Sequence, residues 1–184
     1  EPERGADFWR EVLEYDPSDM EALQSLEQIH ERAKDWEALA DILERRAEYI
    51  EDEQEKTQAY MKLGQIYGDR LKDSERALPA WQALLELQPD NFRARESVKK
   101  SYIELEDWDA LEEFFAADGS WTDYVRQLES LAGQSDDPAT EVDLLMRAVR
   151  VWTDELETPG RATRDLEKIL DIEPDNAKAA SRLI

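Results

Sequence analysis

The sequence predicts an all-α protein made of stacked helical pairs. Apolar residues recur at helical spacing along nearly the whole chain, as in Leu23, Leu26 and Ile29, whereas no stretch alternates between apolar and polar residues with a period of two. Six Gly and seven Pro in 184 residues leave no flexible linker, and segments of the chain repeat one another at fixed distances. These observations indicate one continuous repeat architecture.

Short polar turns interrupt the helical periodicity and place the expected helices. Asp or Ser precedes many apolar segments, where its side chain can accept a hydrogen bond from a free backbone N–H of the first turn. These N-cap candidates are Asp19, Asp35, Ser74, Asp107, Ser120 and Asp136. The expected helices are residues 6–15, 20–33, 36–50, 54–71, 75–87, 91–105, 108–117, 121–132, 138–156, 160–172 and 176–184.

Two registers relate distant parts of the chain. At an offset of 72 residues, segment 9–17 aligns with segment 81–89, and both begin with Trp and end with Pro. At an offset of 85 residues, segment 85–91 aligns with segment 170–176, and both end in Pro-Asp-Asn. A repeat at a fixed offset is the signature of a solenoid, in which each unit stacks on its neighbours.

The two offsets differ by 13 residues, which is the distance from Trp108 to Trp121. The similarity of the segments that begin at these residues suggests that one second-helix segment was duplicated. We therefore expect a single domain over residues 1–184, with about five helical pairs and an irregular step near 116–121. The first and last helices each lack a partner, which suggests a fragment of a longer array.

One repeat carries a known signature, with an aromatic residue, Leu-Gly and Tyr on the first helix, Ala and an aromatic residue on the second, and a closing Pro. The residues are Tyr60, Leu63, Gly64, Tyr67, Ala77, Trp81 and Pro89. This pattern resembles the tetratricopeptide repeat (TPR), with one residue extra between Tyr67 and Ala77. The resemblance implies a right-handed α-solenoid (superhelix) of antiparallel helical hairpins, in which Gly64 allows two helices to approach closely.

The composition is strongly acidic, with 46 Asp plus Glu against 23 Lys plus Arg and a net charge of -23. Nucleic acid is therefore not expected as a partner, because phosphate binding needs a basic face. The chain has no Cys for a disulfide or a thiolate metal site, and no apolar run long enough for membrane insertion. These features favour a soluble protein, with the cytoplasm preferred over an oxidising compartment.

No constellation predicts catalysis, a cofactor or a metal site. Glu27 and His30 have the spacing of a di-iron motif, but the chain has one His, and His30 occupies the position that Tyr67 holds in another repeat. We therefore expect His30 to pack between helices and the protein not to be an enzyme. The recurring aromatic residues are expected in the core: Trp9, Trp36, Tyr60, Tyr67, Trp81, Trp108, Trp121 and Trp152.

The resemblance to TPR proteins also implies a function. In that family the first helix of each pair lines a concave groove that receives a peptide or a partner helix, so we expect a scaffold that binds a protein or peptide. The tentative contacts are Lys62, Gln65, Arg93, Lys100, Arg147 and Arg150. Because five of them are basic in an acidic chain, the partner is expected to be acidic. The alternative is that these basic residues only balance nearby Glu side chains on a solvated face.

A second interpretation stays open alongside the scaffold. The chain could be a structural spacer within a large multidomain or regulatory protein, with no ligand of its own. Its main contacts would then be with flanking repeats, and the isolated chain would associate end to end through its unpaired terminal helices.

Overall fold

The structure, a computed structural model, describes residues 2–183, and every regular element in this part of the chain is helical. The helices form two compact units, unit 1 up to Trp108 and unit 2 from Asp109 onward. In unit 1 they are α1 (Pro2–Tyr15), α2 (Met20–Ala33), α3 (Trp36–Tyr49), α4 (Glu53–Gln65), η1 (Ile66–Leu71), α5 (Ser74–Leu87) and α6 (Phe92–Glu104). From the boundary onward they are α7 (Trp108–Ala117), α8 (Trp121–Ala132), α9 (Pro138–Arg150), η2 (Val151–Glu155), α10 (Pro159–Ile172) and α11 (Ala177–Arg182).

The predicted all-α fold of antiparallel helical hairpins is confirmed, and each of the eleven expected segments is helical within a few residues of its predicted ends, except that residue 184, the predicted end of the last, lies outside the described residues. Two predicted N-caps are wrong by one residue. Asp73 rather than Ser74 caps α5, through its bond from the Arg76 N–H, and Asp137 rather than Asp136 caps α9. In both cases the capping carboxylate accepts a bond from the backbone N–H three residues later, that of Arg76 for Asp73 and that of Thr140 for Asp137.

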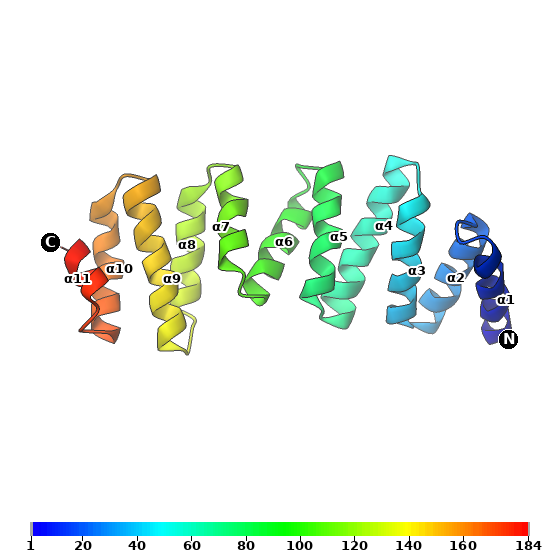
Figure 1. The fold of residues 1–184 in the computed structure, drawn as a ribbon, viewed down its shortest axis with the longest axis horizontal. Helices are drawn as coiled ribbons and strands as arrows, with labels where there is room; N and C mark the ends of the chain where they lie inside the picture. Colours follow the sequence, from blue (N-terminus) through cyan, green and yellow to red (C-terminus); the bar gives the residue numbers. More distant parts are fainter. Residues whose placement is uncertain (1, 184) are drawn as a thin grey trace. The chain divides into compact units, whose positions relative to one another are not determined.

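Unit 1 is a row of helices in which each packs on the next in chain order (Figure 1). Its core is a line of fully buried leucines, including Leu23 and Leu26 of α2 and Leu39 and Leu43 of α3. These residues recur three or four positions apart, so that they lie on one face of each helix. Further along, α4 and α5 meet where Gly64 faces the ring of Trp81.

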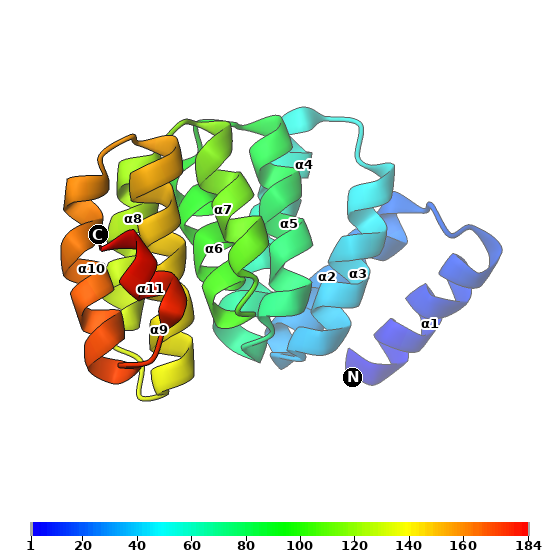
Figure 2. The ribbon, with the colours of Figure 1, turned by 60° about the vertical axis from the view of Figure 1, so that its left-hand side comes forward.

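Unit 2 repeats this arrangement at the 85-residue offset. Leu111 of α7 and Leu128 of α8 are fully buried, and the rings of Phe115 and Tyr124 pack with centroids 5.4 Å apart. Helices α8, α9 and α10 follow side by side, and α11 returns against α10 (Figure 2). At the 85-residue offset Leu111 corresponds to Leu26 of α2, and at the 72-residue offset it corresponds to Leu39 of α3, so the duplication of a second-helix segment stays a prediction.

Two π-helical turns explain the extra residue in the TPR-like signature. The α4 helix continues into η1 and the α9 helix into η2, where the backbone widens from α-helical to π-helical hydrogen bonding. A π-turn accommodates one additional residue without ending the helix. Tyr67 lies in η1 and Trp152 in η2, so both π-turns hold the corresponding aromatic residue of their unit.

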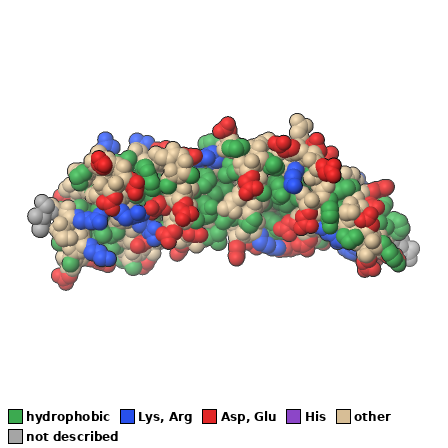
Figure 3. Space-filling model, turned by 45° about the horizontal axis from the view of Figure 1, so that its top comes forward, with side chains coloured by type: hydrophobic (Ala, Val, Ile, Leu, Met, Phe, Trp, Pro, Cys, Tyr) green, Lys and Arg blue, Asp and Glu red, His purple; other side chains and the backbone are tan. Residues whose placement is uncertain are grey.

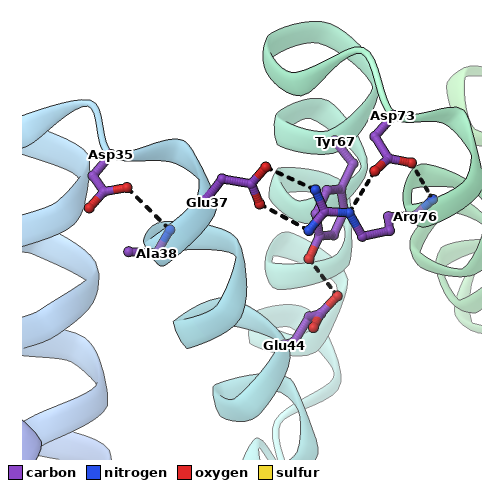
Figure 4. A network of polar contacts seen from close by, with 7 residues as sticks. All are labelled: Asp35, Glu37, Ala38, Glu44, Tyr67, Asp73 and Arg76. Atoms are coloured by element: carbon purple, nitrogen blue, oxygen red, sulfur yellow. Dashed lines mark hydrogen bonds and ion pairs between the residues drawn. The ribbon is translucent and has the colours of Figure 1, made fainter.

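A polar network ties α3, η1 and α5 together in unit 1 (Figure 4). The Tyr67 hydroxyl donates to Glu44 at 2.7 Å, and the Arg76 guanidinium lies over the Tyr67 ring, 4.7 Å from its centroid. Arg76 also binds both carboxylate oxygens of Glu37 at 2.9 Å and the Asp73 carboxylate at 2.7 Å. Burial and the bond to Glu44 raise the pKa of Tyr67, which keeps its hydroxyl protonated as a donor.

Unit 2 contains a related arrangement. The indole N–H of Trp152 donates to Glu129 at 3.2 Å, and Arg161 lies over the Trp152 ring, 5.2 Å from its centroid. Each of these three residues lies 85 positions after its counterpart in unit 1. The set of an aromatic donor, a glutamate and a stacked arginine is therefore part of the repeat and holds the second helices against the π-turn.

Removal of the Tyr67 hydroxyl tests the strength of this network. We expect Tyr67→Phe to lower the free energy of unfolding by about 1 kcal/mol, because one buried hydrogen bond is lost while Glu44 stays accessible to water. Urea denaturation followed by circular dichroism measures the change. The control is Tyr49→Phe, where the exposed hydroxyl forms no hydrogen bond with any described residue and we expect a change below about 0.5 kcal/mol. Equal changes in the two variants would contradict a role for the network.

The predicted core is correct for some residues and not for others. His30 is buried, with 5% of its surface exposed, and packs between helices as expected. Of the recurring aromatic residues, Tyr67, Trp81 and Trp152 are buried and the other five are only half-buried. Trp36, Trp108 and Trp121 begin helices and Tyr60 faces a surface depression, whereas Trp9 packs against the edge of the buried cluster of α1 and α2.

Two further observations concern residues 2–183. No group of three or more His, Asp or Glu side chains in this part of the chain is arranged to hold a metal ion. None of its helices is long and apolar enough to cross a membrane. The single domain over 1–184, the step at 116–121 and the end-to-end association stay predictions.

Candidate peptide-binding clefts

Corresponding residues of the two units line two surface clefts. The unit-1 cleft has a volume of about 550 Å³ and is lined by Glu31, Trp36, Leu39, Gln58, Met61, Lys62, Gln65, Ile66, Asp69 and Arg70. The unit-2 cleft has a volume of about 590 Å³ and is lined by Asp109, Glu112, Glu113, Asp143, Met146, Arg147 and Arg150. Four positions correspond at the 85-residue offset, namely Gln58 with Asp143, Met61 with Met146, Lys62 with Arg147, and Gln65 with Arg150.

The unit-1 cleft has an apolar floor and one cation without an ion pair. Leu39 and Ile66 are buried beneath it, and Trp36 and Met61 are half-buried in its wall. The Arg70 guanidinium lies over the Trp36 ring, 5.1 Å from its centroid, and forms no ion pair with any residue that the structure describes. The stacked ring orients this guanidinium while its N–H groups stay accessible to a ligand.

Lys62, by contrast, is already bound within the unit. Its ammonium lies 2.9 Å from Glu27 and 2.9 Å from Glu31, both on α2. Burial lowers the pKa of Lys62, but the hydrogen bonds to these two carboxylates raise it by more, so the net shift is upward. Glu27 also binds Arg46 of α3 at 2.6 Å, so these charges join α2, α3 and α4.

The unit-2 cleft is acidic and its two arginines are both paired. Arg147 lies 2.7 Å from Asp109 and 3.0 Å from Asp143, and Arg150 pairs with Glu112. Burial lowers the pKa of Arg147, but the bonds to Asp109 and Asp143 raise it by more. These ion pairs join α9 to α7, as Lys62 joins α4 to α2.

Four of the six predicted contact residues lie in these clefts. Lys62 and Gln65 come together in the unit-1 cleft, and Arg147 and Arg150 come together in the unit-2 cleft. The three cations among them are paired with carboxylates of their own unit. Their contact with a partner stays a prediction, and any partner carboxylate has to compete with these internal pairs.

The other two predicted residues, Arg93 and Lys100, line neither cleft. The Arg93 guanidinium lies 5.9 Å from the centroid of the Trp81 ring and 3.7 Å from Asp69. Lys100 is exposed on α6, with its ammonium 3.5 Å from Glu104 one turn later. Arg93 therefore reaches the edge of the unit-1 cleft through Asp69, whereas Glu104, the partner of Lys100, lines neither cleft.

Sequence reasoning missed Arg70 and assigned Trp36 to the core. Arg70 follows Lys62 by eight residues, about two helical turns, and this spacing could have placed it on the same face. Trp36 has the same position in the repeat as Trp108 and Trp121, and this recurrence led to its assignment to the core. In the structure it lies in the wall of the unit-1 cleft.

The charge of the cleft residues differs between the units. The unit-1 cleft contains two carboxylates and two cations, and the unit-2 cleft contains four carboxylates and two arginines. Acidic and basic side chains are interspersed over the face drawn in Figure 3. An acidic ligand is thus better suited to the unit-1 cleft than to the unit-2 cleft.

Comparison with solved structures returns TPR proteins. YrrB, described as a TPR protein with an unusual peptide-binding site, is 21% identical, with 98% of this chain and 82% of that chain covered and a TM-score of 0.44. The TPR domain of P58(IPK) is 22% identical, with 96% and 48% covered and a TM-score of 0.43. MamA is 16% identical, with 94% and 89% covered and a TM-score of 0.41. No protein-family model matches the sequence, and no significant match was found among curated proteins.

The fold follows from the chain's own helices. Antiparallel hairpins stack in sequence order within each unit, and Gly64 lies directly against the Trp81 ring as the signature requires. The repeat recurs at 85 residues together with its π-turns, its clefts and its stacked arginines. The chain therefore has a TPR-like helical repeat fold.

Proposed function

We propose that this chain is a non-catalytic protein-interaction scaffold that binds an extended peptide of a partner protein in the unit-1 cleft. The observation that carries the proposal is Arg70, which is stacked on Trp36 at the edge of an apolar floor and has no carboxylate partner among the described residues. A guanidinium oriented in this way is suited to bidentate binding of a carboxylate.

The unit-1 cleft offers a peptide two kinds of contact, one apolar and one polar. Met61 and the Trp36 ring receive an apolar side chain, and their burial supplies affinity. Arg70 binds a neighbouring Asp or Glu side chain of the peptide, and the Gln65 amide donates a further hydrogen bond. The partner proposed here is acidic, as the sequence predicted. Its main contact is Arg70, whereas the sequence had suggested Lys62.

The lining of the cleft supports binding rather than chemistry. It includes no Ser, Thr or His that could serve as a nucleophile or a general base near pH 7. In the unit-2 cleft, Arg147 and Arg150 pair with three of the four carboxylates, those of Asp109, Asp143 and Glu112.

The three methionines of the chain give the proposal a direct test, because Met61 lies in the unit-1 cleft, Met146 in the unit-2 cleft and Met20 in neither. The chain is labelled with ¹³C at the methionine methyl groups and titrated with a short peptide that contains one Leu flanked by Glu. We expect the Met61 signal to shift and the Met20 signal to stay in place. A peptide with Lys in place of Glu should give a shift several times weaker at the same concentration.

Charge reversal of Arg70 completes the test. We expect Arg70→Glu to weaken binding of the acidic peptide at least about tenfold, which corresponds to loss of one charge-assisted contact plus repulsion. Arg126→Glu, at an exposed arginine of α8 that pairs with Asp123, is the matched control for net charge. Unchanged affinity in Arg70→Glu, or no Met61 shift up to millimolar peptide, would refute the proposed function.

A further inference from the structure

A second depression in unit 1 lies between α3 and α5, with α4 beneath it. Its apolar lining comes from Ala47 of α3, Tyr60 and Leu63 of α4, and Pro79, Ala80 and Ala83 of α5. The volume is about 600 Å³, enough for a large side chain. We call it the α3–α5 hollow. It uses residues of α4 other than the Met61 and Lys62 that line the unit-1 cleft.

Small side chains on α5 keep this hollow open. At the 85-residue offset, Pro79 corresponds to Arg164 and Ala83 to Lys168, so unit 2 has long side chains where unit 1 has short ones. Ala80 likewise corresponds to Asp165, which is buried in unit 2. The repeat fold in unit 2 therefore accommodates larger side chains at these positions. The small side chains that leave the hollow open are a particular property of unit 1.

The rim of the hollow is negative. Glu44, Glu48 and Glu75 line it together with Arg76. Arg76 is neutralised by Glu37 and Asp73, as Figure 4 shows, and so does not balance the rim. Glu48 and Glu75 are exposed, and their carboxylates form no hydrogen bond or ion pair with any described residue. An apolar depression with two unpaired carboxylates on its rim is complementary to an apolar group next to a positive charge.

We propose that the α3–α5 hollow docks a large apolar side chain of a partner protein segment that carries Lys or Arg on both sides of that residue. The apolar side chain contacts Leu63 and Ala80 on the floor, and the flanking cations reach Glu48 on α3 and Glu75 on α5. This partner is opposite in charge to the one proposed for the unit-1 cleft, so the two surfaces can bind two partners at once.

Methyl signals on the floor of the hollow report on docking. The chain is labelled with ¹³C at the alanine and methionine methyl groups and titrated with a short peptide that has one Leu flanked by Lys. We expect shifts at Ala47, Ala80 and Ala83 with none at Met61. Replacement of the peptide Leu by Ala, or of its Lys by Glu, should weaken binding at least about fivefold. Shifts confined to Met61, or equal affinity for the Glu-flanked peptide, would overturn the inference and leave the proposed function to its own test.

The second unit provides the variant that closes the hollow. We expect Ala83→Lys, which introduces the side chain of Lys168 at the corresponding position, to weaken the Lys-flanked peptide about tenfold, through loss of volume and repulsion of its cations. Lys168→Ala in unit 2 is the matched control and should leave the affinity unchanged. Glu48→Lys, at an exposed position that leaves the hollow open, provides a second variant, for which we expect a loss of about threefold or more. Unchanged affinity in both Ala83→Lys and Glu48→Lys would refute docking at this site.

Discussion

Gly64→Ala is expected to lower the free energy of unfolding by about 2 to 4 kcal/mol. A Cβ atom at this position would lie 2.6 Å from Cδ2 and 2.7 Å from Cζ2 of Trp81, and closer still to Cε2. Such distances are well below van der Waals contact, so the indole ring has to move. Trp81 is only 4% exposed and its ring lies against Gly64, so a shift of the ring disturbs the packing between α4 and α5. The loss exceeds the gain of up to about 1 kcal/mol that Ala brings to a helix interior.

Urea denaturation of the variant measures this cost, and two further variants identify its cause. Gly160→Ala in α10, where no atom lies within 4 Å of the new Cβ, should change stability by less than about 1 kcal/mol and in the stabilising direction. In the double variant Gly64→Ala/Trp81→Leu, the added methyl group no longer meets the ring. The double variant should therefore lose less free energy of unfolding than the sum of the losses in the two single variants. An additive result would mean that the ring and the methyl group do not collide.

Gly64 also illustrates how much of the fold could be predicted from sequence. The Leu-Gly pair, the Tyr one turn later and the aromatic residue on the next helix indicate a close helix pair, and the structure has this contact. Helix ends were predictable because Asp19 and Asp35 cap the first turns as expected. The π-turn at η1 was not predicted, although the extra residue before Ala77 is its sequence signal, because an inserted residue fits a turn between helices equally well.

The candidate sites were harder to predict, because pairing between side chains decides which cations are available. The sequence offered Lys62 and Arg147 as candidate contacts for an acidic partner, but in the structure each binds two carboxylates, at least one of them on another helix. Arg70 lies over the ring of Trp36 and forms no such pair with any described residue. Periodicity gives the face on which a residue lies, whereas the partner across the interface depends on the packing of helices that are tens of residues apart.

Asp165 of α10 is a buried acid that neither its helix pattern nor the repeat explains. It is 2% exposed, lies near Glu129 of α8, and its Oδ2 atom has no hydrogen-bond partner. Burial raises the pKa of Asp165 to about 6, and the negative charge and hydrogen bond of Glu129 add to the rise. Lys168 and Arg164 lower this pKa, but by less. The folded protein therefore holds a proton on this side chain more strongly than the unfolded chain does.

Proton linkage converts this shift into a dependence of stability on pH. Below the ordinary value of 3.8, Asp165 is protonated in both states and contributes no penalty. Between that value and about 6, the unfolded state loses the proton while the folded state keeps it, so the contribution of Asp165 to stability falls by about 1.4 kcal/mol per pH unit. Above the folded pKa the penalty is complete, at about 1 to 3 kcal/mol.

Asp165→Asn is therefore expected to raise the free energy of unfolding by about 1 to 3 kcal/mol at pH 7.5, because a neutral amide removes the buried charge and can donate a hydrogen bond to Glu129. The difference from the wild type should shrink steadily between pH 6 and pH 4, where urea denaturation is measured in parallel for the two proteins. Asp171→Asn, an exposed acid on the same helix, controls for the change in net charge and should give a smaller difference in stability that varies less with pH.

An Asp165→Asn variant that is less stable than the wild type at pH 7.5, or a difference in stability that does not vary with pH, would mean that Asp165 is ionised and well accommodated in the folded state. The subtraction of wild type from variant is essential, because Asp16, Asp73 and Asp137 have lowered pKa values and contribute the opposite slope to both proteins.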